Sequence, residues 1–109
     1  MTPEGKIQKE IMDYLEAAGI LHWKHHNTPL RRRKNICKVG VADIIAVLKP
    51  YGTVVAIEVK TPSGVMSEDQ KRFLGQIDAS GGISGVVTSL DDLQRLLGKN
   101  NACDYIKIS

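Results

Sequence analysis

The chain has 109 residues, 42% of them hydrophobic and 25% charged, which suits one soluble domain (residues 1–109) and excludes a second core. It contains no membrane-length apolar run, signal peptide, repeat or low-complexity segment, so we expect a cytoplasmic protein without membrane contact. The net charge of +3 is modest, and the two cysteines, Cys37 and Cys103, follow no metal-ligand spacing, which favours free thiols in a reducing compartment.

The N-terminal part of the chain predicts a helix that carries one carboxylate beside its apolar stripe. Thr2 can cap this helix, with Pro3 in its first position, and Gly19 ends it. The hydrophobic residues recur at helical spacing, at Ile7, Ile11, Tyr14, Leu15 and Ala18. Glu10 lies at the edge of that stripe and not on the opposite, solvated face. Its carboxylate therefore either reaches solvent along the helix surface or has a function near the interior.

A basic segment follows the first predicted strand, which covers Ile20–His26. No acidic residue occurs from Ala17 to Ala42, and the segment Thr28–Val39 reads as a loop containing Pro29. Such a block indicates a polyanion partner, most simply nucleic acid, although its arginine run alone also fits a solvated loop. No recognition helix accompanies the run, so we expect phosphate contacts and not base reading. The side chains expected to contact DNA are Arg31, Arg32, Arg33, Lys34 and Lys38.

Three histidines lie at the end of this first strand, and they raise the question of a zinc site. His22, His25 and His26 are accompanied by no cysteine or fourth ligand at a usable spacing. We therefore interpret them as strand-edge or DNA-facing groups.

The middle of the chain predicts a β-hairpin. Val41–Leu48 and Thr53–Thr61 are rich in β-branched residues, and the residues between them have turn composition. A turn centred between Pro50 and Tyr51 fixes which residues of the two strands lie opposite each other.

That register brings two carboxylates together at one end of the hairpin. Asp43 lies directly opposite Glu58, with Cβ atoms about 4.5–5.5 Å apart. Lys60 points to the same face as Glu58, because side chains two residues apart on a strand share a face. Two such carboxylates repel unless a proton or a cation separates them, and a hard divalent cation is the simplest occupant. A cross-strand ion pair on a wet surface is the alternative, which the apolar character of both faces of the first strand disfavours.

The remainder of the chain predicts a helix, a strand and a second helix. Ser67–Gln70 has the pattern of a capping box that opens the first of these helices, and Gly81–Gly82 end it. A buried strand over Ile83–Thr88 and a helix over Ser89–Gly98 follow, and Tyr105–Ile108 is a possible terminal strand. The order αβββαβα predicts an α/β fold with a central mixed sheet flanked by helices.

These elements and their polar residues resemble the PD-(D/E)xK nuclease superfamily and, more closely, its VRR-NUC family. The resemblance runs from residue 4 to about residue 97 and implies a restriction-endonuclease-like αβββαβ core. Ala42 stands where the superfamily often has proline, a position that supplies no ligand. The matching stretches are Gly40–Asp43, Ala56–Lys60 and Ser67–Phe73, with Glu10 and Trp23 in the preceding helix and strand.

The resemblance implies phosphodiester hydrolysis assisted by Mg²⁺ or Mn²⁺. Lys60 would orient the attacking water or stabilise the developing charge. Gln70 would hydrogen-bond the water, a ligand carboxylate or a phosphate, and its place in the capping box offers a purely structural alternative. The implied metal ligands are Asp43, Glu58, the backbone carbonyl of Val59 and, directly or through a water, Glu10.

Short stand-alone members of this family look like homodimers that act on branched DNA in bacterial or phage-infected cells. The resemblance therefore implies a structure-selective endonuclease of the Holliday-junction-resolving type, and a two-fold dimer suits the two symmetric cuts that a four-way junction needs. A nuclease of flaps or other branched DNA is one alternative. A catalytically inactive nucleic-acid-binding module on the same fold, or a structural partner protein, is another.

Overall fold

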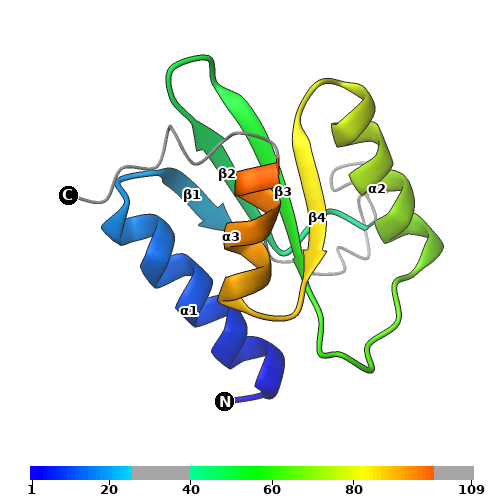
Figure 1. Cartoon of the computed structure of the whole chain (residues 1–109). Coiled ribbons are helices and arrows are strands. Elements are labelled where there is room, and N and C mark those ends of the chain that lie inside the picture. The colour runs from blue at the N-terminus through cyan, green and yellow to red at the C-terminus, as the bar shows by residue number, and fades with distance from the viewer. Residues whose placement is uncertain (26–39, 100–109) are drawn as a thin grey trace, which may run out of the picture.

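The computed structural model describes residues 1–25 and 40–99 and shows the predicted αβββαβα order (Figure 1). The α/β class, with a mixed sheet flanked by helices, is confirmed. The expected basic loop with its DNA-binding residues and the terminal strand lie outside the described residues. The elements are α1 (Pro3–Ala17), β1 (Leu21–Lys24), β2 (Ile44–Leu48), β3 (Thr53–Val59), α2 (Glu68–Ala79), β4 (Ile83–Val87) and α3 (Leu90–Lys99).

The four strands form one sheet in the order β1-β2-β3-β4. The pairs β1–β2 and β2–β3 are antiparallel, whereas β3 and β4 run parallel. In the hairpin, Ile44 pairs with Ile57 and Leu48 pairs with Thr53. This is the register that the turn predicted, so the residue before Ile44 and the residue after Ile57 meet at the same end of the hairpin.

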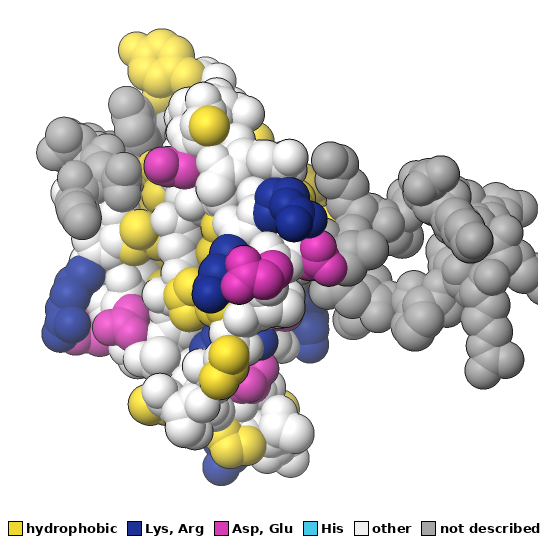
Figure 2. All heavy atoms as spheres, turned by 90° about the vertical axis from the view of Figure 1, so that its right-hand side faces the viewer, with side chains coloured by type: hydrophobic (Ala, Val, Ile, Leu, Met, Phe, Trp, Pro, Cys, Tyr) yellow, Lys and Arg dark blue, Asp and Glu magenta, His cyan; other side chains and the backbone are white. Residues whose placement is uncertain are grey.

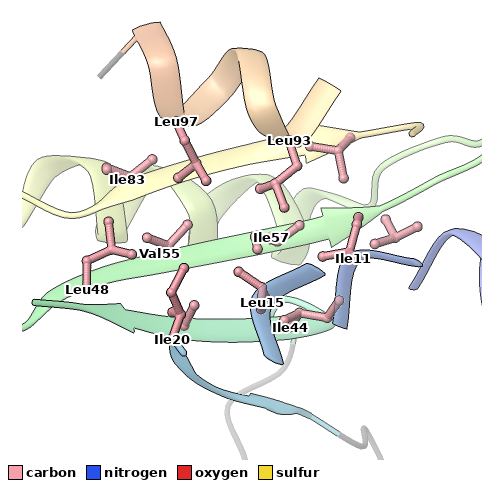
Figure 3. Packing of buried hydrophobic residues seen from close by; sticks show 13 residues of the cluster. Ile11, Leu15, Ile20, Ile44, Leu48, Val55, Ile57, Ile83, Leu93 and Leu97 are labelled. Atoms are coloured by element: carbon pink, nitrogen blue, oxygen red, sulfur yellow. The ribbon is translucent and has the colours of Figure 1, made fainter. Parts of the chain in front are cut away.

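One layer of the core lies between the sheet and the helices α1 and α3. Side chains alternate along a strand, and every second residue of β2 and β3 points into this layer. Figure 3 shows Leu93 and Leu97 of α3 and Ile11 and Leu15 of α1 gathered around β3. The layer contains Ile11 and Leu15 of α1, Ile44, Ala46 and Leu48 of β2, Val55, Ile57 and Val59 of β3, and Leu93 and Leu97 of α3.

The second, smaller layer lies on the other face of the sheet, under α2. Ala42, Ile45, Ala56 and Leu74 are buried there, with Phe73 and Ile77 of α2 packed against them. Because Ile57 and Val59 point toward α1 and α3, the alternate residues of β3 must point toward α2. The face that Glu58 and Lys60 share is therefore the α2 face.

Several predicted boundaries were wrong by one to three residues. Strand β1 is shorter at both ends than predicted, β2 begins at Ile44, and β3 ends at Val59. The N–H of Val59 donates to a side-chain oxygen of Asp43 at 2.9 Å, so a side chain takes the place of a ladder bond at that end. Helix α3 continues through Gly98 to Lys99, one residue beyond the predicted end. Within the described ranges, no helix has the length and apolar character needed to cross a membrane.

Gly40 brings the chain that leads into β2 directly against the first turn of α2. Its φ of 80° lies in the left-handed region, which glycine adopts without strain. A Cβ at this position would lie 2.4 Å from the carbonyl carbon of Asp69 and 2.7 Å from the amide nitrogen of Gln70. The close approach sets where the segment carrying Asp43 lies relative to α2.

We predict that Gly40→Ala destabilises the protein more than Gly52→Ala. Gly52 also has a positive φ, of 70°, but a Cβ there meets nothing within 4 Å. The control should therefore lose only the conformational term, about 1–2 kcal/mol, and Gly40→Ala a further 1–3 kcal/mol or so through overpacking. Urea unfolding measures both losses. Equal losses of unfolding free energy in the two variants would show that Gly40 is not tightly packed against α2.

Candidate metal centre and active site

Asp43 is held at the start of β2 by hydrogen bonds from both neighbouring strands. Its carboxylate Oδ2 accepts the N–H of Val59 at 2.9 Å, and its backbone carbonyl accepts the N–H of His25 at 2.8 Å. The first bond ties the side chain to β3 and the second ties the backbone to the end of β1. Asp43 is thereby fixed opposite Glu58, as the register predicted.

Glu58 is the one charged side chain that is fully buried among the described residues, with 1% of its surface exposed. Its Oε2 accepts a hydrogen bond from Nε2 of Gln70 at 3.1 Å and lies 3.9 Å from Nζ of Lys60. Its Oε1 is buried without a hydrogen-bond partner in that part of the chain. One carboxylate oxygen is thus held by protein groups and the other is not.

Burial, together with the hydrogen bond and the negative charge of Asp43, raises the pKa of Glu58 from 4.5 to about 8, against the lowering effect of Lys60. At neutral pH the metal-free pair therefore keeps a proton. A divalent cation in the same place would displace this proton, since it stabilises both carboxylates in their charged form.

Lys60 follows β3 directly, and the turn that comes next packs against its aliphatic stem. Its backbone N–H donates to the carbonyl of Val87 at 3.0 Å, and only 17% of its side chain is exposed. Gly64 closes the turn with a hydrogen bond to the carbonyl of Thr61, and a Cβ at Gly64 would lie 3.2 Å from the aliphatic stem of Lys60. Sequence reasoning predicted a chain break at this turn but missed its packing on the lysine.

Gln70 belongs to the capping box and to the site at the same time. Oε1 of Gln70 accepts the backbone N–H of Ser67 at 2.9 Å, and Oγ of Ser67 accepts the backbone N–H of Gln70 at 3.1 Å. The predicted capping box is confirmed. Because the cap occupies the amide oxygen, the amide nitrogen is left to donate to Glu58. The structural interpretation of Gln70 is therefore confirmed, and the contact with Glu58 is compatible with its predicted role at the site.

Glu10 does not join Asp43 and Glu58 in a three-residue ligand group. It is exposed on α1, and its neighbour Ile11 points into the layer on the opposite face of the sheet (Figure 3). Within residues 1–25 and 40–99, no three His, Cys, Asp or Glu side chains are grouped so that they could hold a metal. The role of Glu10 as a metal ligand therefore stays a prediction. The same finding gives no support to zinc binding by His22 and His25.

The residues that do meet fit a hard divalent cation. Asp43 and Glu58 supply carboxylate oxygens, the ligands that Mg²⁺ and Mn²⁺ prefer. The buried Oε1 of Glu58, which lacks a partner, is an observation that a bound cation would explain. The carbonyl of Val59 is predicted as a further ligand.

The surface around α2 is mixed in charge (Figure 2). Nζ of Lys71 lies 3.3 Å from a carboxylate oxygen of Glu68, and a guanidinium nitrogen of Arg72 lies 3.0 Å from one of Asp69, with all four side chains substantially exposed. These pairs neutralise one another, so the described part of this face offers no concentrated positive charge to a polyanion.

The VRR-NUC domain model matches residues 2–91 of the chain. The protein belongs to the VRR-NUC family. A solved structure described as a VRR_NUC domain is 26% identical, with a TM-score of 0.67, and the match covers 90% of this chain and 97% of that one. Another, a "VRR_NUC domain protein", is 19% identical with a TM-score of 0.65, over 97% of this chain and 89% of that one, and supports the fold alone. No curated protein matches the chain. The VRR-NUC fold is of the nuclease type.

We predict that Glu58→Gln stabilises the metal-free VRR-NUC protein increasingly as the pH rises. The folded state keeps the Glu58 proton up to about pH 8, whereas the unfolded chain releases it near pH 4.5, so wild-type stability falls between these values. Glutamine mimics the protonated acid and does not titrate. Thermal unfolding in EDTA should show a Tm difference between variant and wild type that widens from pH 5 to pH 8 by on the order of 15 °C.

Glu68→Gln serves as the control, because Glu68 is an exposed acid paired with an exposed lysine, and its replacement should change the Tm little. A Tm difference for Glu58→Gln that does not change with pH would contradict the raised pKa of Glu58.

Proposed function

We propose that this protein is a Mg²⁺- or Mn²⁺-dependent endonuclease that hydrolyses phosphodiester bonds in branched DNA, with four-way junctions as the favoured substrate. The observation that carries the proposal is that Asp43 and Glu58 lie opposite each other. Oε1 of Glu58 is buried and has no partner among the described residues, and Lys60 and Gln70 lie beside Glu58. Membership of a nuclease-type family supports the same reaction class. The preference for branched DNA rests on resemblance to the short family members.

Asp43 and Glu58 would hold the cation. When bound, it would supply a water of lowered pKa and would neutralise charge on the phosphate. Gln70 occupies Oε2 of Glu58 and leaves Oε1 for the cation, so the hydrogen bond orients the ligand. The ammonium of Lys60, which lies 3.9 Å from Oε2 of Glu58, would supply a positive charge where negative charge develops on the phosphate.

DNA would reach this site with the help of the basic segment in the sequence. Because the described face around α2 is balanced in charge, Arg31, Arg32, Arg33, Lys34 and Lys38 are the natural source of phosphate contacts. Two copies of the chain related by a two-fold axis would place one site on each of two symmetric strands of a junction. We therefore propose a homodimer that works in the cytoplasm, where the DNA is.

A binding module that has lost catalysis is the main rival. Burying Glu58 next to Asp43 costs stability, as the raised pKa of Glu58 records. A protein that only binds nucleic acid gains nothing from this cost and would tolerate apolar or neutral residues in both positions. The retained carboxylates, lysine and glutamine favour the enzyme.

We predict that the wild-type protein cuts a labelled four-way junction in Mg²⁺ or Mn²⁺ and does not cut it in EDTA. Asp43→Asn and Glu58→Gln should each lower the single-turnover rate constant by at least about 100-fold, because each removes a charged ligand of the cation (about 2.7 kcal/mol of barrier). Gel analysis of cleavage of junction, flap, linear duplex and single-stranded substrates measures the rate and the preference.

Asp91→Asn is the matched control, since Asp91 is an exposed acid on α3 that pairs only with Arg95 among the contacts described, and this variant should cut at the wild-type rate. The absence of cleavage of every substrate with either metal would refute the proposal. Wild-type rates for Asp43→Asn and Glu58→Gln would refute it too. Cleavage of flaps in preference to junctions would overturn the junction assignment and keep the nuclease.

A further inference from the structure

His25 lies in one row across the sheet with the two carboxylates. The last regular pair of β1 and β2 is Lys24 with Ile44, so the next pair along is His25 with Asp43, and the 2.8 Å hydrogen bond from the N–H of His25 to the carbonyl of Asp43 shows that the pairing continues. Directly paired residues project to the same face of a sheet. His25, Asp43 and Glu58 therefore stand side by side and face α2.

The same row contains the two buried side-chain polar atoms that lack a hydrogen-bond partner within residues 1–25 and 40–99. They are Nε2 of His25 and Oε1 of Glu58, one on either side of Asp43. Such atoms are rare because each costs stability, and each calls for an explanation. The proton that the metal-free carboxylate pair keeps can serve Oε1 of Glu58, whereas no described group serves Nε2 of His25. A hydrated cation held by the carboxylates would serve both atoms.

His22 shows that this is not a general property of histidines on β1. Its pairing with Ala46 places it on the opposite face, toward α1. There its Nδ1 lies 2.7 Å from the carbonyl of Ile20, and its Nε2 lies 3.9 Å from a carboxylate oxygen of Glu16. His22 is thus a histidine of the same strand whose Nδ1 has a hydrogen-bond partner within the protein and whose Nε2 lies near a carboxylate.

We propose that His25 is a positioning residue of the cation site, whose Nε2 hydrogen-bonds a water in the hydration shell of the divalent cation held by Asp43 and Glu58. The inference rests on the proposed function. A hydrated cation suits the row, because Mg²⁺ keeps several of its waters when it binds to a protein. Direct ligation by His25 is disfavoured, since hard cations prefer oxygen and the described side chains form no three-residue ligand group. Outer partners of this kind commonly tune metal affinity.

The test compares His25→Phe with His22→Phe in the full chain, without DNA. Isothermal titration with Mn²⁺ should give a Kd about 10-fold higher for His25→Phe than for the wild type, and an unchanged Kd for His22→Phe. Thermal unfolding in EDTA should show that His25→Phe is no less stable than the wild type, because it removes a buried atom without a partner. His22→Phe should be the less stable variant, since it loses the contacts of its ring nitrogens.

His25→Gln completes the set, because its side-chain amide can replace the hydrogen bond, and it should recover most of the affinity. An unchanged Kd for His25→Phe overturns the inference about His25. A Kd that rises together with a lowered Tm in EDTA and is not recovered by glutamine also overturns it, since the role would then be structural. If the wild type itself binds no Mn²⁺, the proposed function fails as well. Loss of binding in Glu58→Gln, with His25→Phe unaffected, refutes His25 alone.

Discussion

The apposition of two carboxylates inside the sheet is the constraint on which the rest of this structure depends. Asp43 and Glu58 face each other from neighbouring strands, and burial together with Asp43 raises the pKa of Glu58 to about 8. Left to themselves, these groups would move apart or be solvated. The surroundings prevent both: the N–H of Val59 fixes one acid, Gln70 fixes the other, and Gly40 presses the approach to β2 against α2.

One face of the sheet carries most of the hydrophobic core, and the other carries the candidate active site. The face under α1 and α3 carries the larger apolar layer, and every second residue of β3 serves it. The face under α2 has a smaller apolar layer. At the end of β3, the side chains of Glu58 and Lys60 point to this face, where Gln70 donates a hydrogen bond to Glu58 and Lys60 lies close to it. A single strand thus supplies core residues and site residues in turn, so a one-residue slip of β3 would exchange the two sets and destroy both.

The sequence was informative wherever local rules fix the geometry. The turn between β2 and β3 determined the register that pairs Asp43 with Glu58, and the pattern of Ser67 and Gln70 determined the capping box. Strand ends were less predictable, because the Asp43 side chain replaces a ladder bond there. The position of Glu10 was not predictable either: helical spacing placed it at the edge of an apolar stripe, but only tertiary packing decides which face of the sheet α1 covers. His25 shared a strand signal with His22, and only the sheet pairing separates their faces.

The most direct test of the central claim is a crystal structure of the wild-type protein grown with Mn²⁺ and measured at a wavelength where manganese scatters anomalously. We expect an anomalous peak from a manganese ion that is coordinated by the carboxylates of Asp43 and Glu58. No peak at that position at saturating Mn²⁺, or a manganese ion bound elsewhere while the two acids still share a proton, would contradict it.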